Sequence, residues 1–240
     1  MIDWLRRPAA APTVQLGAAT LPVAIRRNPR AKRMILRLAP DGREVCVTIP
    51  PWGRDAEAVA FARSRAGWLQ AQLDTLSAPA DPVAEGAFAY RGRSIAIAWN
   101  RALPRRPELV GDRLALGGPA DTLPRRLQRW LEEEAKRLMS VDLAEYCNRA
   151  GVPQPALHLS RARRRWGSCA SDGTIRINWR LVQAPDRVRR SVVAHEVAHL
   201  LHFNHSPAFH ACLVKLFEGD LVAADHWLKQ EGRSLYRQFG

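Results

Sequence analysis

Hydrophobic and polar residues alternate in short runs through the first half of the chain. A period of two is typical of β-strands that bury one face. The runs predict strands over Leu21–Arg27, Arg33–Leu38, Glu44–Ile49, Phe88–Tyr90 and Ser94–Trp99, with a further hairpin around Gly111-Asp112. Between the two groups of strands, the apolar spacing over Asp55–Leu76 predicts a helix, with Gly67 as a candidate break or kink. The first half is therefore expected to be β-rich with one helix.

Helical spacing dominates the second half. Apolar residues predict a long amphipathic helix that Gly151 ends, carrying Leu127, Trp130, Leu131, Leu138 and Val141. Strands are predicted over Ala156–Ser160, Trp166–Ala170 and Thr174–Asn178, and helices over Asp186–Phe203 (with Asp186 as N-cap), Ser206–Phe217 and Leu221–Phe239. The Gly- and Pro-rich segment Leu116–Pro124 is the best candidate for a boundary. The sequence thus predicts an α+β protein, with a β-rich region over residues 1–118 and a second domain over residues 119–240.

The helix predicted from Asp186 contains the motif H-E-x-x-H. Residues four apart on a helix lie about 40° apart around its axis, so His195 and His199 can bind one metal ion. Glu196 follows the first of these residues and can reach a water molecule without binding the metal. This is the arrangement that metal-assisted hydrolysis requires, with Glu196 as the general base. The alternative is a helix with two packed or exposed histidines.

A catalytic zinc ion needs a third protein ligand and an open position. The sequence offers four candidates: His202, His205, His210 and Glu218. His202 is two turns from His195, too far along the helix to share an ion. His205 is favoured because Asn204 tolerates the left-handed conformation that ends a helix, and Ser206-Pro207 is typical of the start of the next one. His205 would then lie in a tight turn and fold back toward the metal.

Together with two further segments, these residues resemble a known family. H-E-x-x-H-x-x-x-x-x-H, present as His195, Glu196, His199 and His205, is similar to the motif of the YgjP-like and SprT-like zinc metallopeptidases. The runs RRRWGSC (163–169) and GTIRINWRLVQAP (173–185) resemble the YgjP-like branch in particular. The resemblance implies a zincin-like metallopeptidase domain, built from a small antiparallel sheet and active-site helices. It also implies that the three histidines hold Zn²⁺ and that Glu196 is the base.

The composition adds a strong positive charge. Lys and Arg number 37 against 23 Asp and Glu, a net charge of +14, and 33 of the 37 are Arg. Nine Arg and two Asp lie between Arg161 and Arg190, a local charge of +7 just before the zinc motif. This segment predicts contact with a nucleotide or a nucleic acid. A solvated or ion-paired face and a genomic bias toward Arg are the competing interpretations.

Substrate contacts are expected near the motif from Arg164, Arg165, Trp166, His202 and His210. The strand over Trp166–Ala170 is a candidate to align an extended peptide by backbone pairing. The competing interpretation, which we favour for Trp166, is that its side chain packs beneath the active-site helix.

The cysteines and the apolar segments of the sequence indicate the cellular compartment. The four cysteines form no C-x-x-C pair, which fits a reducing cytosol. The segment Met1–Ala11 does not resemble a signal peptide, and no apolar run is long enough to span a membrane. A cytoplasmic protein is expected.

The sequence therefore predicts a zinc-dependent metallopeptidase that acts on peptides or proteins. One alternative keeps the metal site and hydrolyses nucleoside triphosphates to release pyrophosphate. Another is a DNA-associated protease like the SprT and Spartan proteins. A purely structural zinc site is disfavoured, because such sites are usually closed by four protein ligands.

Overall fold

The computed structural model describes residues 11–74 and 80–239. The chain divides into two compact units, Met1–Pro79 and Ala80–Phe239. Almost all of Met1–Ala11, for which no signal peptide is expected, lies outside the described residues, as does Leu76 at the end of a predicted helix. No helix among the described residues is long and apolar enough to cross a membrane.

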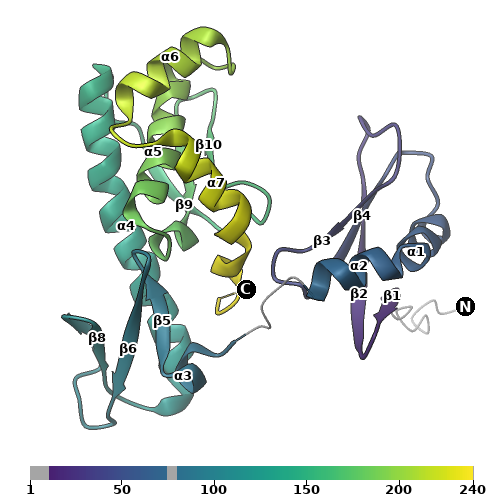
Figure 1. The fold of residues 1–240 in the computed structure, drawn as a ribbon, viewed down its shortest axis with the longest axis horizontal. Coiled ribbons are helices and arrows are strands. Elements are labelled where there is room, and N and C mark those ends of the chain that lie inside the picture. The colour runs from purple at the N-terminus through teal and green to yellow at the C-terminus, as the bar shows by residue number, and fades with distance from the viewer. Residues whose placement is uncertain (1–10, 75–79, 240) are drawn as a thin grey trace, which may run out of the picture. The chain divides into compact units, whose positions relative to one another are not determined.

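The first unit is a four-stranded sheet with two helices (Figure 1). Its elements are β1 (Thr13–Leu16), β2 (Ala19–Arg27), β3 (Ile35–Leu38), β4 (Val45–Ile49), α1 (Asp55–Ser64) and α2 (Ala66–Asp74). β2 to β4 correspond to the predicted strands, and β1 is additional. The alternation along β4 buries Val45, Val47 and Ile49 against Ala58 and Ala62 of α1, which accounts for the period of two in the sequence.

The single helix predicted over Asp55–Leu76 is two helices. α1 ends at Arg65, which leaves helical geometry at φ −106° and ψ 16°. The break is therefore at Arg65 and not at Gly67, which lies within α2, where an added Cβ would meet open space.

The second unit contains the H-E-x-x-H segment and has two sheets and five helices. Its elements are α3 (Pro82–Glu85), β5 (Ala87–Tyr90), β6 (Arg93–Trp99), β7 (Glu108–Val110), β8 (Arg113–Leu116), α4 (Leu123–Ala150), β9 (Leu157–Ser160), β10 (Gly167–Cys169), β11 (Ile175–Asn178), α5 (Asp186–Leu201), α6 (Pro207–Leu216) and α7 (Leu221–Glu231). Short 3₁₀ turns lie at Ala120–Thr122, Trp179–Val182 and Gly232–Tyr236. α4 ends at Gly151 in the left-handed conformation, as predicted, but Val141 of its expected apolar face is 59% exposed.

The two four-stranded sheets have the same topology. The first has the strand order β1-β2-β4-β3 and the second β5-β6-β8-β7. In each, an antiparallel hairpin is followed by a parallel pair and then a second antiparallel pair. The repeated topology is seen in the strand pairing and not in the residues, because the strands of the two sheets have different sequences.

The sheet nearest the H-E-x-x-H helix has three strands in the order β10-β11-β9. β10 and β11 form the expected hairpin, but β11 and β9 are parallel, so the sheet is mixed and not antiparallel as the sequence predicted. The parallel pairing is possible because β10 returns the chain: Ser160 and Gly167 lie at the same end of β11, opposite Asn178 and Ile177, and β10 runs back to the other end before β11 begins. β10 pairs with β11 alone among the described strands and is an edge strand.

The division between the units differs from the boundary expected at residues 118 and 119. Phe88, Ile95 and Leu114, which precede that boundary, share one hydrophobic cluster with the residues of α4 and α5. The glycines near the expected boundary have a packing role: a Cβ on Gly117 would lie 1.7 Å from the carbonyl oxygen of Leu103. The Gly-rich composition therefore reflects a close backbone approach within one unit.

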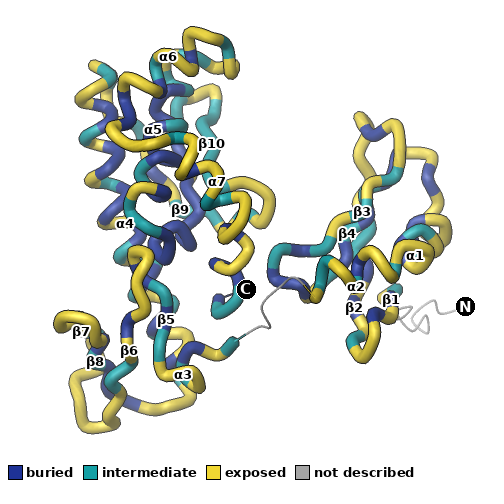
Figure 2. Tube along the Cα trace, in the orientation of Figure 1, coloured by how far each residue is buried: buried dark blue, intermediate teal, exposed yellow. Residues whose placement is uncertain are grey.

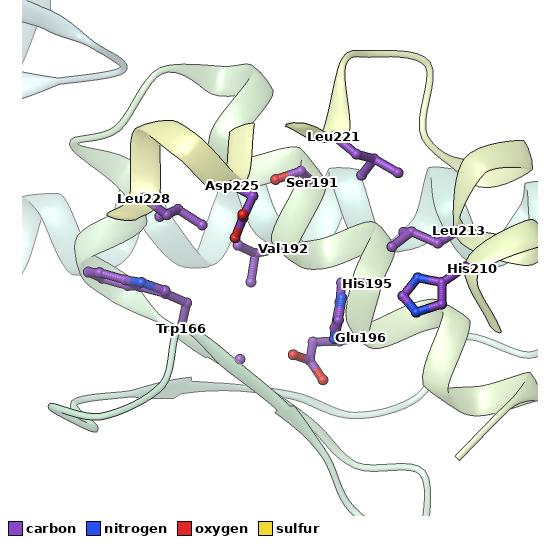
Figure 3. A pocket seen from close by; sticks show the side chains of 11 residues that line it. Trp166, Ser191, Val192, His195, Glu196, His210, Leu213, Leu221, Asp225 and Leu228 are labelled. Atoms are coloured by element: carbon purple, nitrogen blue, oxygen red, sulfur yellow. The ribbon is translucent and has the colours of Figure 1, made fainter. Parts of the chain in front are cut away.

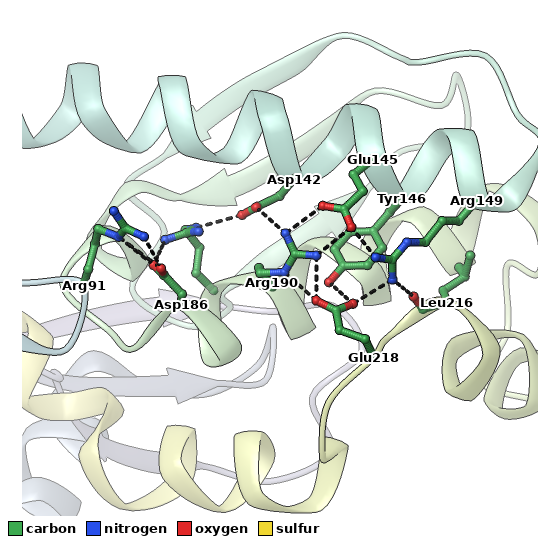
Figure 4. Close-up of polar contacts among 10 residues, drawn as sticks. Arg91, Asp142, Glu145, Tyr146, Arg149, Asp186, Arg190, Leu216 and Glu218 are labelled. Carbon is green, nitrogen blue, oxygen red and sulfur yellow. Dashed lines mark hydrogen bonds and ion pairs between the residues drawn. The ribbon is translucent and has the colours of Figure 1, made fainter.

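A network of ion pairs holds α5 against α4 (Figure 4). Arg189 of α5 donates to Asp142 of α4 at 2.8 Å, and these side chains are only 3% and 4% exposed. Arg190, the next residue, pairs with Asp142 at 3.1 Å, with Glu145 at 2.8 Å and with Glu218 at 2.6 Å. The network anchors the helix one to two turns before His195.

Breaking this network should destabilise the second unit. Asp142→Asn removes the charge that faces Arg189 and Arg190 but preserves the size of the side chain, so we expect the free energy of unfolding to fall by about 2 kcal/mol. Lys229→Ala is the matched control, because its pair with Asp225 is exposed and should contribute at most about 0.5 kcal/mol. Urea unfolding followed by tryptophan fluorescence measures both. Equal stability of the two variants would contradict a supporting role for the buried pair.

Candidate metal centre and active site

α5 carries the H-E-x-x-H residues along one side of its last two turns. The helix is surrounded by α4, α6 and α7, and most of its residues are buried (Figure 2). It begins at Asp186, which follows the N-cap Pro185, so Asp186 is not the N-cap that the sequence predicted. The Asp186 carboxylate instead accepts hydrogen bonds from Arg91 at 3.0 and 3.1 Å and pairs with Arg189.

The turn after α5 carries His205. α5 ends because His202 adopts an extended conformation at φ −137° and ψ 102°. Asn204 does not have the left-handed conformation predicted for it, since Arg91 is the only non-glycine residue with positive φ among the described residues. As expected, Ser206 caps α6: its hydroxyl accepts a hydrogen bond from the Phe209 N–H at 3.4 Å, and Pro207 is the first helical residue.

This turn brings three imidazoles together. The Nε2 atom of His195 lies 3.2 Å from Nε2 of His199 and 3.1 Å from Nε2 of His205. The ligand atoms of the three residues all lie within 4.8 Å of one another. Four-coordinate zinc with bonds of 2.0–2.1 Å places ligand nitrogens about 3.3 Å apart. A single Nε2 has one proton or one lone pair and cannot form both close contacts as hydrogen bonds, so the cluster fits a shared metal ion.

Two features prepare the imidazoles to bind a metal. The Nδ1 atom of His199 donates to the main-chain carbonyl of His202 at 3.1 Å, which leaves the lone pair on Nε2. Burial lowers the pKa of His199, and burial and the neighbouring imidazoles lower the pKa of His195 to about 4. Both rings are therefore neutral near pH 7, the form that binds a metal.

Phe209 is a residue that sequence reasoning missed. It is fully buried at the start of α6, and its ring lies 5.0, 4.6 and 4.8 Å from the rings of His195, His199 and His205. It packs against all three imidazoles and limits the rotamers open to them. An apolar residue four positions after His205, on a predicted helix, was the available signal.

Glu196 is buried against the edge strand β10. Only 5% of its surface is exposed, and a Cβ on Gly167 would lie 2.3 Å from its Oε1 atom. Burial raises the pKa of Glu196 to about 7, while the charge of Arg165 and a backbone hydrogen bond from Cys169 act in the opposite direction. Gly167 is therefore required at this position so that the carboxylate can lie directly on the strand.

The remaining candidate ligands have other positions. His202 contributes its carbonyl to the orientation of His199, and His210 is exposed and lines a cavity beside His195 and Glu196. Glu218 accepts hydrogen bonds from Tyr146 at 2.9 Å and Arg149 at 2.8 Å within the ion-pair network. Burial raises the pKa of Glu218, but its hydrogen bonds lower it to about 2, so it is an ionised partner of arginines and is distant from the histidine cluster.

Trp166 packs against the C-terminal 3₁₀ turn, a partner that the sequence did not predict. Its half-buried ring lies 5.8 Å from that of Tyr236 and against Gly232, where an added Cβ would lie 2.8 Å from the indole. It packs on the C-terminal 3₁₀ turn and also lines the cavity beside Glu196. Arg164 is exposed, and Arg165 is exposed but close enough to influence the Glu196 carboxylate.

Several arginines of the basic segment support the fold. Arg161 pairs with Glu132 of α4 at 2.7 Å. Arg180 is buried between the rings of Trp179 and Tyr236 and donates to the carbonyl of Phe239 at 2.8 Å. With Arg189 and Arg190, four of the nine arginines are therefore engaged in holding the second unit together, which leaves less of the local charge for an external partner.

Comparison with protein families supports the resemblance seen in the sequence. A family model described as the YgjP-like metallopeptidase domain matches residues 32–231. The chain belongs to the YgjP-like family. A search of curated proteins gives no match. The match begins inside the first compact unit, at residue 32, and includes the histidine cluster, Glu196 and β10. The later part of the first unit, with β3, β4, α1 and α2, therefore belongs to the matched domain.

Proposed function

We propose that this YgjP-like protein is a zinc-dependent peptidase in which His195, His199 and His205 hold the metal and Glu196 is the general base. The observation that carries the proposal is the convergence of three imidazoles beside a buried carboxylate, with the Nε2 atom of His195 3.2 Å from that of His199 and 3.1 Å from that of His205. Three imidazoles leave the open coordination position that catalysis needs.

A bound zinc ion would polarise the scissile carbonyl and lower the pKa of a water molecule. The Glu196 carboxylate accepts the proton of the attacking water at one of its oxygens and then transfers it to the leaving amine. Its burial and its raised pKa suit this exchange, because a group with a pKa near 7 can both accept and release a proton at neutral pH.

The edge strand β10 offers a means to align an extended substrate. Trp166 and Ala170 use their backbone groups to bond toward β11, and residues alternate along an antiparallel pair. Gly167 and Cys169 therefore direct their backbone groups to the other edge of β10, where the Cys169 N–H already donates to the Glu196 carboxylate. An extended peptide paired here would run past the carboxylate with its backbone already oriented.

Metal analysis paired with His205→Ala tests the ligand assignment. We expect the purified protein to contain one zinc ion per chain and to lose and regain peptide hydrolysis when the metal is removed and restored. His205→Ala should lose zinc on dialysis, because two histidines hold the ion much more weakly than three. His226→Ala, at an exposed position outside the cluster, is the control and should keep its zinc. Retention of zinc by His205→Ala would exclude His205 as a ligand.

The substrate assay should contain unfolded proteins and nucleoside triphosphates in parallel, because Arg165 lies near Glu196. We expect zinc-dependent cleavage of the peptide bond. Release of pyrophosphate without any peptide cleavage would overturn the peptidase assignment and favour the nucleotide hydrolase.

A further inference from the structure

A cavity of about 460 Å³ adjoins the candidate catalytic carboxylate (Figure 3). Glu196 and His195 form part of its wall, and the rest comes from α5, α6, α7 and the start of β10. Its size is within the range of sites that enclose a small ligand or one large side chain. A substrate whose scissile bond lies at the histidine cluster would place a neighbouring side chain at the mouth of this cavity.

Most of the cavity wall is apolar. Val192 and Leu213 are more than 90% buried, and Leu221, Leu228 and the ring of Trp166 complete the wall. Ser191 also lines it, but its hydroxyl already donates to the carbonyl of Val188 at 2.9 Å. This wall favours a substrate side chain with a long apolar stem, because the stem leaves water when it enters.

Asp225 adds a negative charge to the cavity wall on the α7 side. Among the described residues that line it, Glu196 and Asp225 carry carboxylates, and none is Lys or Arg. Figure 3 shows the Asp225 carboxylate directed into the cavity from α7, between Leu228 and Val192. Asp225 also pairs with Lys229 on the same helix at 2.5 Å, but both side chains are more than half exposed, and such pairs are weak enough for a substrate cation to replace.

We propose that this cavity binds a lysine or arginine side chain of the substrate beside the scissile bond and that Asp225 selects for its positive charge. The apolar wall accommodates the methylene stem, and the carboxylate pairs with the charged end. An acidic side chain or a phosphate would face Asp225, and no Lys or Arg among the described lining residues could pair with it. This inference rests on the proposed peptidase function and adds the substrate class to it.

Peptides that differ at a single position next to the cleaved bond test the inference. The series carries Arg, Lys, Leu or Glu at that position, and kcat/KM is measured for each. We expect the native chain to prefer Arg and Lys over Leu and to cleave the Glu peptide least. Asp225→Asn should lower the ratio of kcat/KM for the Arg peptide to that for the Leu peptide about fivefold, and Asp225→Arg should make the Glu peptide the better substrate. Glu231→Gln, which removes a carboxylate at the end of the same helix but outside the cavity, should leave the ratio unchanged.

A binding measurement separates this inference from catalysis. In a Glu196→Gln background, fluorescence anisotropy should show tighter binding of the labelled Arg peptide than of the Glu peptide, and adding Asp225→Asn should reduce that difference. If no peptide is cleaved by the native chain, the proposed function fails. If peptides are cleaved but the preference for Arg is absent or does not respond to Asp225, the peptidase stands and this inference is overturned.

Discussion

Glu196→Gln is expected to lower kcat for peptide hydrolysis about a thousandfold. Glutamine has nearly the same size and hydrogen-bonding reach as glutamate, but its amide cannot accept a proton from the attacking water at neutral pH. The carboxylate is 95% buried against β10 and is not part of the histidine cluster, so the variant should keep its fold and its zinc. Kinetics and metal analysis of the same sample measure the two quantities independently.

Glu231→Gln is the matched control, because Glu231 is an exposed glutamate of the same unit outside the site. It should retain the native kcat. A Glu196→Gln variant that keeps more than a tenth of the native activity with full zinc content would exclude Glu196 as the base.

Gly167→Ala is expected to lower kcat at least about a hundredfold without loss of zinc. The added Cβ would lie 2.3 Å from Oε1 and 2.7 Å from Cδ of Glu196, far closer than carbon and oxygen atoms can approach. The carboxylate must move, and displacement of a catalytic group by about 1 Å costs on the order of a hundredfold in rate. The three heavy atoms nearest to the added Cβ all belong to Glu196 and none to a histidine, so metal binding should persist.

Gly67→Ala provides the control for the glycine substitution itself. An added Cβ at Gly67 meets nothing within 4 Å, and the residue lies inside α2, so alanine should raise stability by about 0.5–1 kcal/mol and leave kcat unchanged. If Gly167→Ala were as active as Gly67→Ala, Glu196 would not need its position against β10.

The two substitutions differ in how their sites are found. Glu196 is identified from the local spacing of the motif, whereas the role of Gly167 follows from a contact in the folded chain. H-E-x-x-H identifies His195, Glu196 and His199 from the sequence because their spacing matches the turn of a helix, and local hydrogen bonding enforces that turn. His205 is also predicted locally, from the cap and proline that start α6. The reason given for it was partly wrong, because the chain leaves α5 through an extended His202 and not through a left-handed Asn204.

Contacts between distant segments could not be predicted in the same way. The sequence around Gly167 does not predict that the carboxylate of Glu196, 29 residues later, packs directly against this glycine. The alternation along β9 and β11 predicts strands but not their direction, since parallel and antiparallel pairs bury the same faces. The glycines at 117 and 118 suggested a boundary, because composition alone does not distinguish a linker from a close backbone approach.

The charged residues also show the difference between what the sequence predicts and what the fold determines. The excess of arginine between residues 161 and 190 is plain in the sequence, and it raised the expectation of an anionic partner. Folding directs Arg189 and Arg190 to the carboxylates of α4 and buries Arg180 between two aromatic rings, while the cavity beside Glu196 receives Asp225 from α7. The residue types and their local spacing establish a metal-binding helix with its base. The choice of which charges face the substrate depends on the packing of helices far apart in the chain, because only packing decides which side chains are neutralised and which remain exposed in the site.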